Sequence, residues 1–347
     1  MRLGRSRWGR ARVVRMGALC AVALPLVLGG CGRGPVGSAA PSTSTPVVTA
    51  PARNAPASGE YLLESSDKYY ADLRATLPTV TDAHVRANLE RLLRTPVAEW
   101  LARDLDVTVG TIRQDLARAH TTESIPMFVA YGIPGRDLHG ESGGGQAGAD
   151  AYKQWIQGVS DTIGANPAIV ILEPDALPHA TEMNDADRAA RLALLGFAYG
   201  QLLQHNPATA VYVDVGNSTW VDPGRVADLL RAISPNQPVA GISLNVANRR
   251  PEAEIRSYAA RIEQAYGHQL YVMIDSSVNG APNTADLVDW CNPHGQKVGT
   301  LPSTRFDRDA MVEHAFIKTP GQSDGRCGTS DQPAGEFDRQ LLLDQLS

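Results

Sequence analysis

The chain has 347 residues, with 37 acidic and 32 basic side chains and a formal net charge of −5. This length gives one large domain, or two smaller ones, enough apolar side chains for a core. The mildly acidic balance and the lack of a long basic run argue against a nucleic acid partner.

The first 30 residues have the pattern of an export signal. Six arginines between Arg2 and Arg15 precede an almost wholly apolar run, residues 17–30. That run is too short for an ordinary transmembrane helix. It ends in Leu28-Gly-Gly-Cys31, which resembles the bacterial lipobox and implies cleavage before Cys31 and lipid on its sulfur. We therefore expect a tether at the outer face of a membrane; a plain secretory signal with an incidental cysteine is the alternative.

Residues 32 to about 59 are rich in Pro, Ser, Thr, Ala and Gly and contain few large apolar side chains. Such a segment cannot bury enough surface to fold, so we expect a semi-extended linker. Three segments follow from these patterns. They are a lipoprotein signal peptide at 1–30, a lipidated cysteine with its linker at 31–59, and a folded domain at 60–347.

The cysteines support an exported protein. Cys20 leaves with the signal and Cys31 is the expected lipid site, which leaves Cys291 and Cys327. An even pair outside the cytoplasm predicts a disulfide, with two free buried thiols as the alternative. Neither cysteine has the neighbouring ligands that a metal site requires.

Helix-period and strand-like segments alternate along the rest of the chain. A helical region over 66–94 precedes a possible first strand over 96–101. Strand and helix then alternate, which predicts parallel βαβ units and about seven strands in a barrel-like α/β sheet with an open mouth. The remaining predicted strands are 127–131, 169–172, 210–214, 239–245, 270–275 and 315–318; the predicted helices are 149–163, 186–205, 223–233 and 251–266.

Acidic side chains recur where these strands end, at the rim on which α/β proteins place their chemistry. Cleavage of a glycosidic bond needs one protonated acid and a second carboxylate that activates water or attacks carbon. Crowding of carboxylates raises a pKa, as a general acid requires. For one acid, capping of a helix or pairing with an arginine is the favoured interpretation. Six together favour catalysis: Asp137, Glu173, Asp175, Asp214, Asp275 and Asp324.

Aromatic side chains near the same rim suit the apolar faces of sugar rings. Trp100, Trp220 and Trp290 lie at or just beyond strand ends, and Trp220 is the best binding candidate. Trp155 lies inside a predicted helix and is expected in the core.

Several short motifs follow one another in order over about residues 95–330. They are Tyr131-Gly-Ile-Pro-Gly-Arg-Asp137 with Ser142-Gly-Gly, Leu172-Glu-Pro-Asp175-Ala-Leu, Tyr212-Val-Asp214-Val-Gly-Asn-Ser-Thr-Trp220, Leu244-Asn-Val-Ala-Asn248, Ile274-Asp275-Ser-Ser-Val-Asn279-Gly, Trp290-Cys291-Asn-Pro and Ile317-Lys318-Thr-Pro-Gly-Gln-Ser-Asp324-Gly. This ordered set resembles glycoside hydrolase family 6, the β-1,4-glucanases and cellobiohydrolases. The resemblance implies a distorted, incomplete β/α barrel that inverts the anomeric centre in a single displacement.

The resemblance also implies catalytic roles. Asp175 would be the general acid, and Asp137 would raise the pKa of that acid and help to order the water. Asp324 would be the base, acting on the attacking water directly or through a second water. Asp214 would support the acid region, and Ser142 would hold the nucleophilic water.

The remaining implied roles concern the substrate and one covalent link. Tyr131 would lie under the −1 sugar, and Cys291 and Cys327 match the family's C-terminal disulfide, which would fix the loop of Asp324. The implied glucosyl contacts are Trp100, Trp220, Asn248, Trp290 and Lys318.

Four positions depart from the family pattern. Gln322 stands where Glu is usual, Asn217 where His is common, and Val278 where Arg is frequent. Leu138 follows Asp137 where Cys is usual, so the family's first disulfide is missing. These changes affect binding and support positions, while the three acids most closely tied to chemistry remain.

The sequence therefore predicts an inverting endo-β-1,4-glucanase, a cellulase that acts on a β-glucan polysaccharide or oligosaccharide. The compact folded region leaves little chain for a roof, which favours an open cleft and cleavage of internal bonds. We expect an extracytoplasmic, lipid-anchored monomer, or a secreted one if the lipobox is not used, that needs no cofactor or metal. The alternatives are a carbohydrate-binding lipoprotein without turnover and a purely structural envelope protein.

Overall fold

The computed structural model describes residues 52–281 and 290–347. The predicted signal peptide, Cys31 and most of the predicted linker lie outside these residues. None of the helices in the two described ranges is both long and apolar enough to cross a membrane.

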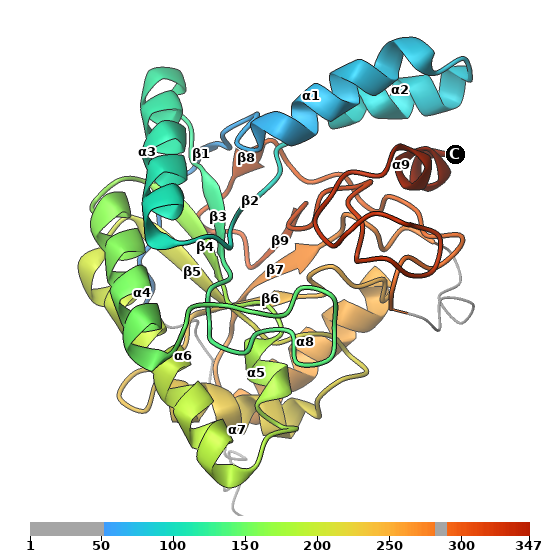
Figure 1. Ribbon diagram of the computed structural model, residues 1–347. Coiled ribbons are helices and arrows are strands. Elements are labelled where there is room, and N and C mark those ends of the chain that lie inside the picture. The colour runs from blue at the N-terminus through green and yellow to red at the C-terminus, as the bar shows by residue number, and fades with distance from the viewer. Residues whose placement is uncertain (1–51, 282–289) are drawn as a thin grey trace, which may run out of the picture. The chain divides into compact units, whose positions relative to one another are not determined.

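A seven-stranded parallel sheet forms the centre of the domain (Figure 1). Its strands neighbour one another in chain order, which requires a crossover between each pair and agrees with the predicted alternation of strand and helix. A separate two-stranded sheet pairs β1 (Gly59–Glu60) with β8 (Arg305–Phe306). The strands of the large sheet are β2 (Glu99–Leu101), β3 (Met127–Ala130), β4 (Ala168–Leu172), β5 (Thr209–Asp214), β6 (Gly241–Leu244), β7 (Tyr271–Asp275) and β9 (Val312–Ala315).

The first and last strands of this sheet meet beside their ends. Val97, just before β2, forms an isolated parallel bridge with Phe316, just after β9. The N–H of Ala98 donates to the carbonyl of Phe316 at 3.0 Å. The sheet therefore curls almost into a closed ring, which confirms the predicted incomplete β/α barrel. We call this junction between residues 97–98 and 316 the seam.

Helices lie around the outside of the curled sheet, with α3, α4, α6, α7 and α8 beside its strands (Figure 1). The N-cap of α7 follows the sequence prediction, because the Asp222 carboxylate accepts from Gly224 N–H at 2.8 Å and Pro223 opens the helix. The helices are α1 (Asp67–Thr76), the 3₁₀ turn η1 (Leu77–Thr79), α2 (Ala83–Leu92), α3 (Leu105–Thr122), α4 (Ala149–Ile163), α5 (Ala176–His179), α6 (Asp185–His205), α7 (Pro223–Ile233), α8 (Glu252–Tyr266) and α9 (Arg339–Leu346).

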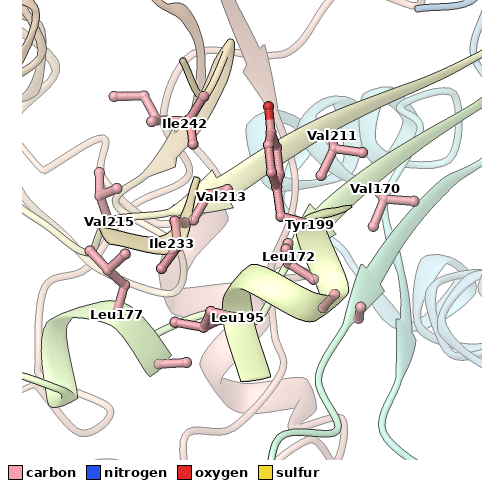
Figure 2. Close-up of a cluster of buried hydrophobic side chains, with 14 of the residues drawn as sticks. Val170, Leu172, Leu177, Leu195, Tyr199, Val211, Val213, Val215, Ile233 and Ile242 are labelled. Atoms are coloured by element: carbon pink, nitrogen blue, oxygen red, sulfur yellow. The ribbon is translucent and has the colours of Figure 1, made fainter. Parts of the chain in front are cut away.

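Alternate residues of each buried strand enter two different parts of the core. In β4, Val170 and Leu172 pack outward against the helices, whereas Ile169 and Ile171 fill the inside of the barrel. Figure 2 shows the outer layer, in which side chains of β4 and β5 meet Leu195 and other side chains of α6 and α7. Because both faces are covered, these strands carry the continuous apolar runs by which the sequence identified them.

Several predicted elements need correction. The helical region over 66–94 is two helices, because the Leu77–Thr79 turn with Pro78 interrupts it. Helix α3 was not predicted, since buried Thr108 and Asp115 weaken its apolar period. The last strand ends at Ala315 rather than running from 315 to 318, because Phe316 leaves β7 to form the seam.

The packed domain also begins earlier than the predicted boundary between residues 59 and 60. The guanidinium of Arg53 lies 3.4 Å from the ring centroid of Tyr271. It donates to the Tyr212 hydroxyl at 2.8 Å and to the Arg308 carbonyl at 2.7 Å. Residues 52–59 of the predicted linker thus belong to the fold, because one arginine anchors them among aromatic side chains.

Candidate active site

A cavity of about 740 Å³ opens at the carboxyl ends of the strands. The loops that follow several different strands line it, which is the usual arrangement when a barrel carries a reaction. Of the residues to which the resemblance assigns a catalytic or substrate role, Asp214 is absent from the lining and the others are present. The predicted rim acids Glu173 and Asp275 are also absent from it. Those present are Trp100, Tyr131, Asp137, Ser142, Asp175, Trp220, Asn248, Trp290, Lys318 and Asp324.

Asp175 stands at the bend between β4 and α5 and is half-buried in the cavity wall. Its backbone is left-handed, with φ +68°, a conformation that costs free energy for a residue with a side chain. Burial, then the charges of Asp214 and Asp137, raise the pKa of Asp175 well above its usual range. This shift favours the protonated form of the carboxyl, as a proton donor requires.

Asp214 lies behind Asp175, is fully buried and is absent from the cavity lining, so it does not contact a substrate bound there. Its carboxylate accepts from the Asp175 N–H at 2.9 Å, the Gly216 N–H at 3.1 Å and the Ser243 hydroxyl at 3.1 Å. Burial raises the pKa of Asp214 to about 7, while these three hydrogen bonds favour its charged form. Asp214 therefore fixes the backbone of Asp175 and contributes negative charge behind it.

Two further acids of the predicted mouth are also turned inward. Glu173 is fully buried and accepts from the backbone N–H groups of Gly132 and Ile133, each at 3.0 Å. Asp275 is 1% exposed and accepts from the backbone of Ala247 at 2.9 Å and of Lys318 at 3.0 Å. Glu173, Asp214 and Asp275 therefore have structural roles, although they neither cap a helix nor pair with an arginine: each carboxylate accepts hydrogen bonds from backbone N–H groups of neighbouring loops.

Asp137 organises the loop over residues 136–145, which we call the Asp137 loop. Its Oδ2 accepts from the Ser142 N–H at 2.6 Å, and the loop base closes through Gly135 N–H to Gly144 O at 2.8 Å. A Cβ at Gly140 would lie 2.2 Å from Oδ1 of Asp137, so a larger residue there would push this carboxylate out of its position. The loop thus holds Asp137 and Ser142 next to one another at the cavity.

Asp324, another residue of the cavity lining, is held between two cations. Its oxygens lie 2.5 Å from Lys318 Nζ and 2.5 Å from Arg249 Nη2, and its side chain is only 7% exposed. Burial acts to raise the pKa of Asp324, but Lys318 and Arg249 outweigh it and lower that pKa. The charged form of Asp324 is therefore favoured in the same cavity in which the protonated form of Asp175 is favoured.

A disulfide fixes the backbone around Asp324. Cys291 and Cys327 are bonded, which confirms the predicted pair. Asn292, next to Cys291, donates its N–H to Asp324 Oδ2 at 2.9 Å and accepts the Asp324 N–H at 2.8 Å. The covalent link therefore acts on Asp324 through one intervening asparagine.

Aromatic side chains line separate parts of the cavity. Trp100 meets Tyr131 edge to face at 5.1 Å, and its indole N–H donates across the seam to Ile317 O at 2.8 Å. Trp220 packs edge to face against His179, with 4.8 Å between the ring centroids. Trp290 is 54% exposed and offers a face to solvent at the cavity rim. Trp155 is 1% exposed in the core, as predicted.

Sequence reasoning missed four side chains of this site. Arg249 directly follows the Asn248 motif, and its pairing with Asp324 could have been sought from that position. His139, His179 and Glu182 also line the cavity, close to Asp137 and Asp175 in the chain. Each is a common surface residue type outside the quoted motifs, so the pattern gave no signal for them.

The four departures from the family pattern lie in different surroundings. Gln322 lines the cavity and donates to Gly335 O at 3.0 Å, and Asn217 accepts from Thr219 N–H at 3.1 Å in a local turn. Val278 is fully buried, whereas Leu138 is 39% exposed. Among residues 52–281 and 290–347, no three His, Cys, Asp or Glu side chains are grouped as metal ligands.

The fold and site together define a class of protein. An incomplete β/α barrel carries one carboxyl with a raised pKa and one with a lowered pKa in a cavity lined by aromatic side chains, as in hydrolases that cleave glycosidic bonds. The chain matches the family described as Glycosyl hydrolases family 6 over residues 60–340. It belongs to this family.

Named relatives and solved structures agree with this assignment. The chain is 36% identical over 263 residues to Endoglucanase 1 of Streptomyces halstedii. The matched region covers 74% of this chain and 79% of that protein. The chain is similar in structure to the endoglucanase Cel6 from Mycobacterium tuberculosis in complex with methyl-cellobiosyl-4-deoxy-4-thio-β-D-cellobioside. That likeness has a TM-score of 0.74 and 31% identity over 84% of this chain and 98% of the other. Endoglucanase Cel6B from Humicola insolens shares the fold, with a TM-score of 0.72, 22% identity and coverage of 83% and 96%.

Proposed function

We propose that this protein hydrolyses internal β-1,4-glucosidic bonds of cellulose or a related β-glucan, with inversion at the anomeric carbon. The observation that carries the proposal is the contrast between Asp175 and Asp324, which line one cavity with pKa values shifted in opposite directions. A pair of carboxyl groups divided in this way supplies the proton donor and the water-handling partner of a glycosidase.

The proton donor acts first. Asp175 gives its proton to the leaving glycosidic oxygen, and its charge then develops beside Asp214 and Asp137. Those two acids raise the pKa of Asp175 and so keep it protonated until the glycosidic oxygen takes the proton. No covalent intermediate is needed, because water replaces the leaving group from the opposite face of the sugar.

The Asp137 loop handles the attacking water. Asp137 and Ser142 lie together through the 2.6 Å hydrogen bond, and both line the cavity. We assign the Ser142 hydroxyl to hold the water and Asp137 to orient it. Their loop is internally braced, so the water is positioned before the bond breaks.

Asp324 is assigned the role of base, with its activation linked to substrate. A carboxylate paired with two cations accepts a proton poorly, because both cations stabilise its charged form. Lys318, an expected glucosyl contact, lines the cavity together with Asp324. When a sugar hydroxyl engages Lys318, Asp324 loses part of this stabilisation and becomes a better acceptor for the proton of the water, directly or through a second water.

The substrate and the mode of attack follow from the cavity and the relatives. Trp100, Tyr131, Trp220 and Trp290 supply several aromatic surfaces for a chain of glucosyl units. The bacterial relatives at 31–36% identity are named endoglucanases. These observations support binding of a β-glucan in an open cleft and cleavage within the chain.

We assign the protein to the outer face of the cell membrane, as a monomer held by lipid on Cys31. The support comes from the arginine-rich apolar leader and from Leu28-Gly-Gly-Cys31, together with the disulfide, which suits an oxidising compartment. Fractionation tests this assignment: Cys31→Ser should move the protein from the membrane to the soluble fraction. An unchanged membrane fraction would contradict the lipid anchor.

The hydrolase proposal is tested with Asp175→Asn, which keeps the shape of the carboxyl but removes its proton. Wild-type protein should release reducing sugars from amorphous cellulose or mixed-linkage β-glucan, with the inverted anomer visible by NMR before mutarotation. The variant should lose about 10²-fold or more of this activity and still bind cello-oligosaccharides. Retention of activity within a few-fold would refute the assignment.

The same assay separates the runner-up function. Gln322 lines the cavity where the family pattern has Glu, which motivates a carbohydrate-binding protein with weak turnover. Saturable oligosaccharide binding by wild-type protein, with no sugar released across acidic, neutral and alkaline buffers, would favour that alternative. Absence of saturable sugar binding would instead favour a structural envelope protein.

A further inference from the structure

One carboxylate in the cavity wall connects parts of the site that the chain keeps apart. Oε1 of Glu182 accepts from the indole N–H of Trp220 at 2.9 Å. Its Oε2 lies 3.0 Å from Nε2 of His139. All three side chains line the cavity, so the connection lies beside the position of the substrate.

The three side chains come from three different loops. Glu182 follows α5, the helix that starts directly after Asp175, and Trp220 comes from the loop after β5. His139 lies in the Asp137 loop, two residues beyond Asp137. A single side chain therefore ties the loop of the proton donor to a sugar-binding tryptophan and to the loop that handles water.

The surroundings of Glu182 favour its charged form. Burial alone would raise its pKa, but the hydrogen bond from Trp220 and the nearby His179 and His139 lower it. His179 Nδ1 lies 3.6 Å from Oε1, and the His179 ring packs edge-on against Trp220. Hydrogen bonds to a charged carboxylate are stronger than those between neutral groups, so both connections can hold their partners in place.

We propose that Glu182 is a positioning residue with two separable effects: its Oε1 orients Trp220 for sugar binding, and its Oε2 holds the Asp137 loop through His139. The inference rests on the proposed hydrolase function and extends it to residues outside the family motifs. It assigns no direct role in bond cleavage to Glu182. Its consequence is that loss of one carboxylate should alter binding and turnover by different routes.

Kinetics on cellohexaose test the two effects separately. Glu182→Ala should raise KM and lower kcat, each by roughly 3- to 10-fold, because both partners lose a charge-assisted bond. His139→Ala should reproduce the fall in kcat with little change in KM. Glu182→Gln should keep KM within about 2-fold of wild type, since the amide oxygen still accepts from the indole N–H.

A double-mutant cycle isolates the Trp220 effect. Trp220→Phe keeps an aromatic face and removes the N–H, so Glu182 has nothing left to orient. In that background Glu182→Ala should raise KM by less than about 2-fold. An undiminished KM increase there would overturn the Trp220 part, and an unchanged kcat in both Glu182→Ala and His139→Ala would overturn the loop part.

Controls distinguish this inference from folding and from the proposed function. Glu90 on α2 forms an ion pair with Arg86, in which Arg86 Nε lies 3.4 Å from Glu90 Oε1. Glu90 does not line the cavity, so Glu90→Ala should leave kcat and KM unchanged. Thermal melting of each variant reports its folding. Wild-type protein that hydrolyses cellohexaose while Glu182→Ala matches it in kcat and KM would overturn the inference alone. If wild type releases no sugar, the hydrolase proposal fails, and calorimetric binding of cellohexaose still decides the Trp220 part, because equal affinity in Glu182→Ala would overturn it.

Discussion

Replacement of Glu99 by glutamine should make the protein more stable than wild type, increasingly so as pH rises. Glu99 lies on β2, close to Asp115 of α3 and Asp67 of α1. Burial, then the charges of Asp115 and Asp67, raise the pKa of Glu99 from its usual 4.5 to about 8. Glutamine resembles the protonated form and carries no charge at any pH.

The sign and size follow from this pKa. Between pH 4.5 and 8 the folded protein keeps a proton on Glu99 that the unfolded chain has released, so wild-type stability falls with rising pH. Each pH unit in this window is worth about 1.4 kcal/mol. Relative to wild type, Glu99→Gln should therefore gain up to about 3 kcal/mol by pH 7 and up to about 5 kcal/mol above pH 8. These values are upper limits, because the Glu99 side chain is partly exposed and can turn toward water when it is charged.

Urea unfolding followed by tryptophan fluorescence, from pH 4.5 to just above pH 8, measures this difference. The two proteins should have similar free energies of unfolding at the lowest pH and should diverge steadily until about pH 8. Glu90→Gln, at a partly exposed glutamate of α2, serves as a matched control for the loss of one glutamate charge. A Glu99→Gln difference that is independent of pH would refute the reasoning.

Three further perturbations have defined outcomes. Asp214→Asn removes a negative charge that raises the pKa of Asp175, so the basic limb of the kcat–pH profile should move to lower pH; an unmoved limb contradicts the coupling. Arg53→Ala should lower the free energy of unfolding by about 1–3 kcal/mol, through loss of the Tyr271 contact and two hydrogen bonds. Equal stabilities of variant and wild type in chemical denaturation would show that Arg53 does not anchor residues 52–59. The Cys291→Ser, Cys327→Ser double variant should lose several-fold in kcat, because the anchored Asn292 holds Asp324; full activity in a reducing-sugar assay would exclude that role for the disulfide.

The sheet was predictable because its strands are buried on both faces. Continuous apolar runs such as 168–172 and 210–213 are typical of strands covered on both sides, and helices such as α4 have a strong apolar period. Helix α3 was not predicted because two of its buried residues are polar. Thr108 accepts a hydrogen bond from Trp155, and Asp115 forms an ion pair with Arg118. Such polar substitutes for apolar side chains cannot be recognised before their partners are known.

The sequence motifs predicted which residues belong to the candidate site, but not which way their side chains point. Asp137, Asp175 and Asp324 lie in one cavity, as expected for residues at strand ends. The motifs could not show that Asp214 turns inward, since an acid at the end of a strand gives the same pattern whether it faces substrate or a backbone N–H. Arg249 was missed for the same reason, because its importance lies in its contact with Asp324.

The seam has a mechanical consequence for the whole domain. It is the line along which the ring of strands is most weakly joined, and Trp100 and Lys318 lie on its two sides close to the cavity. A glucan that contacts both residues would bridge this line and hold its edges together. Bound substrate would then reinforce the barrel where its backbone pairing is thinnest, and the slowing of hydrogen exchange on binding should be greatest at the amides of residues 97–101 and 316–318.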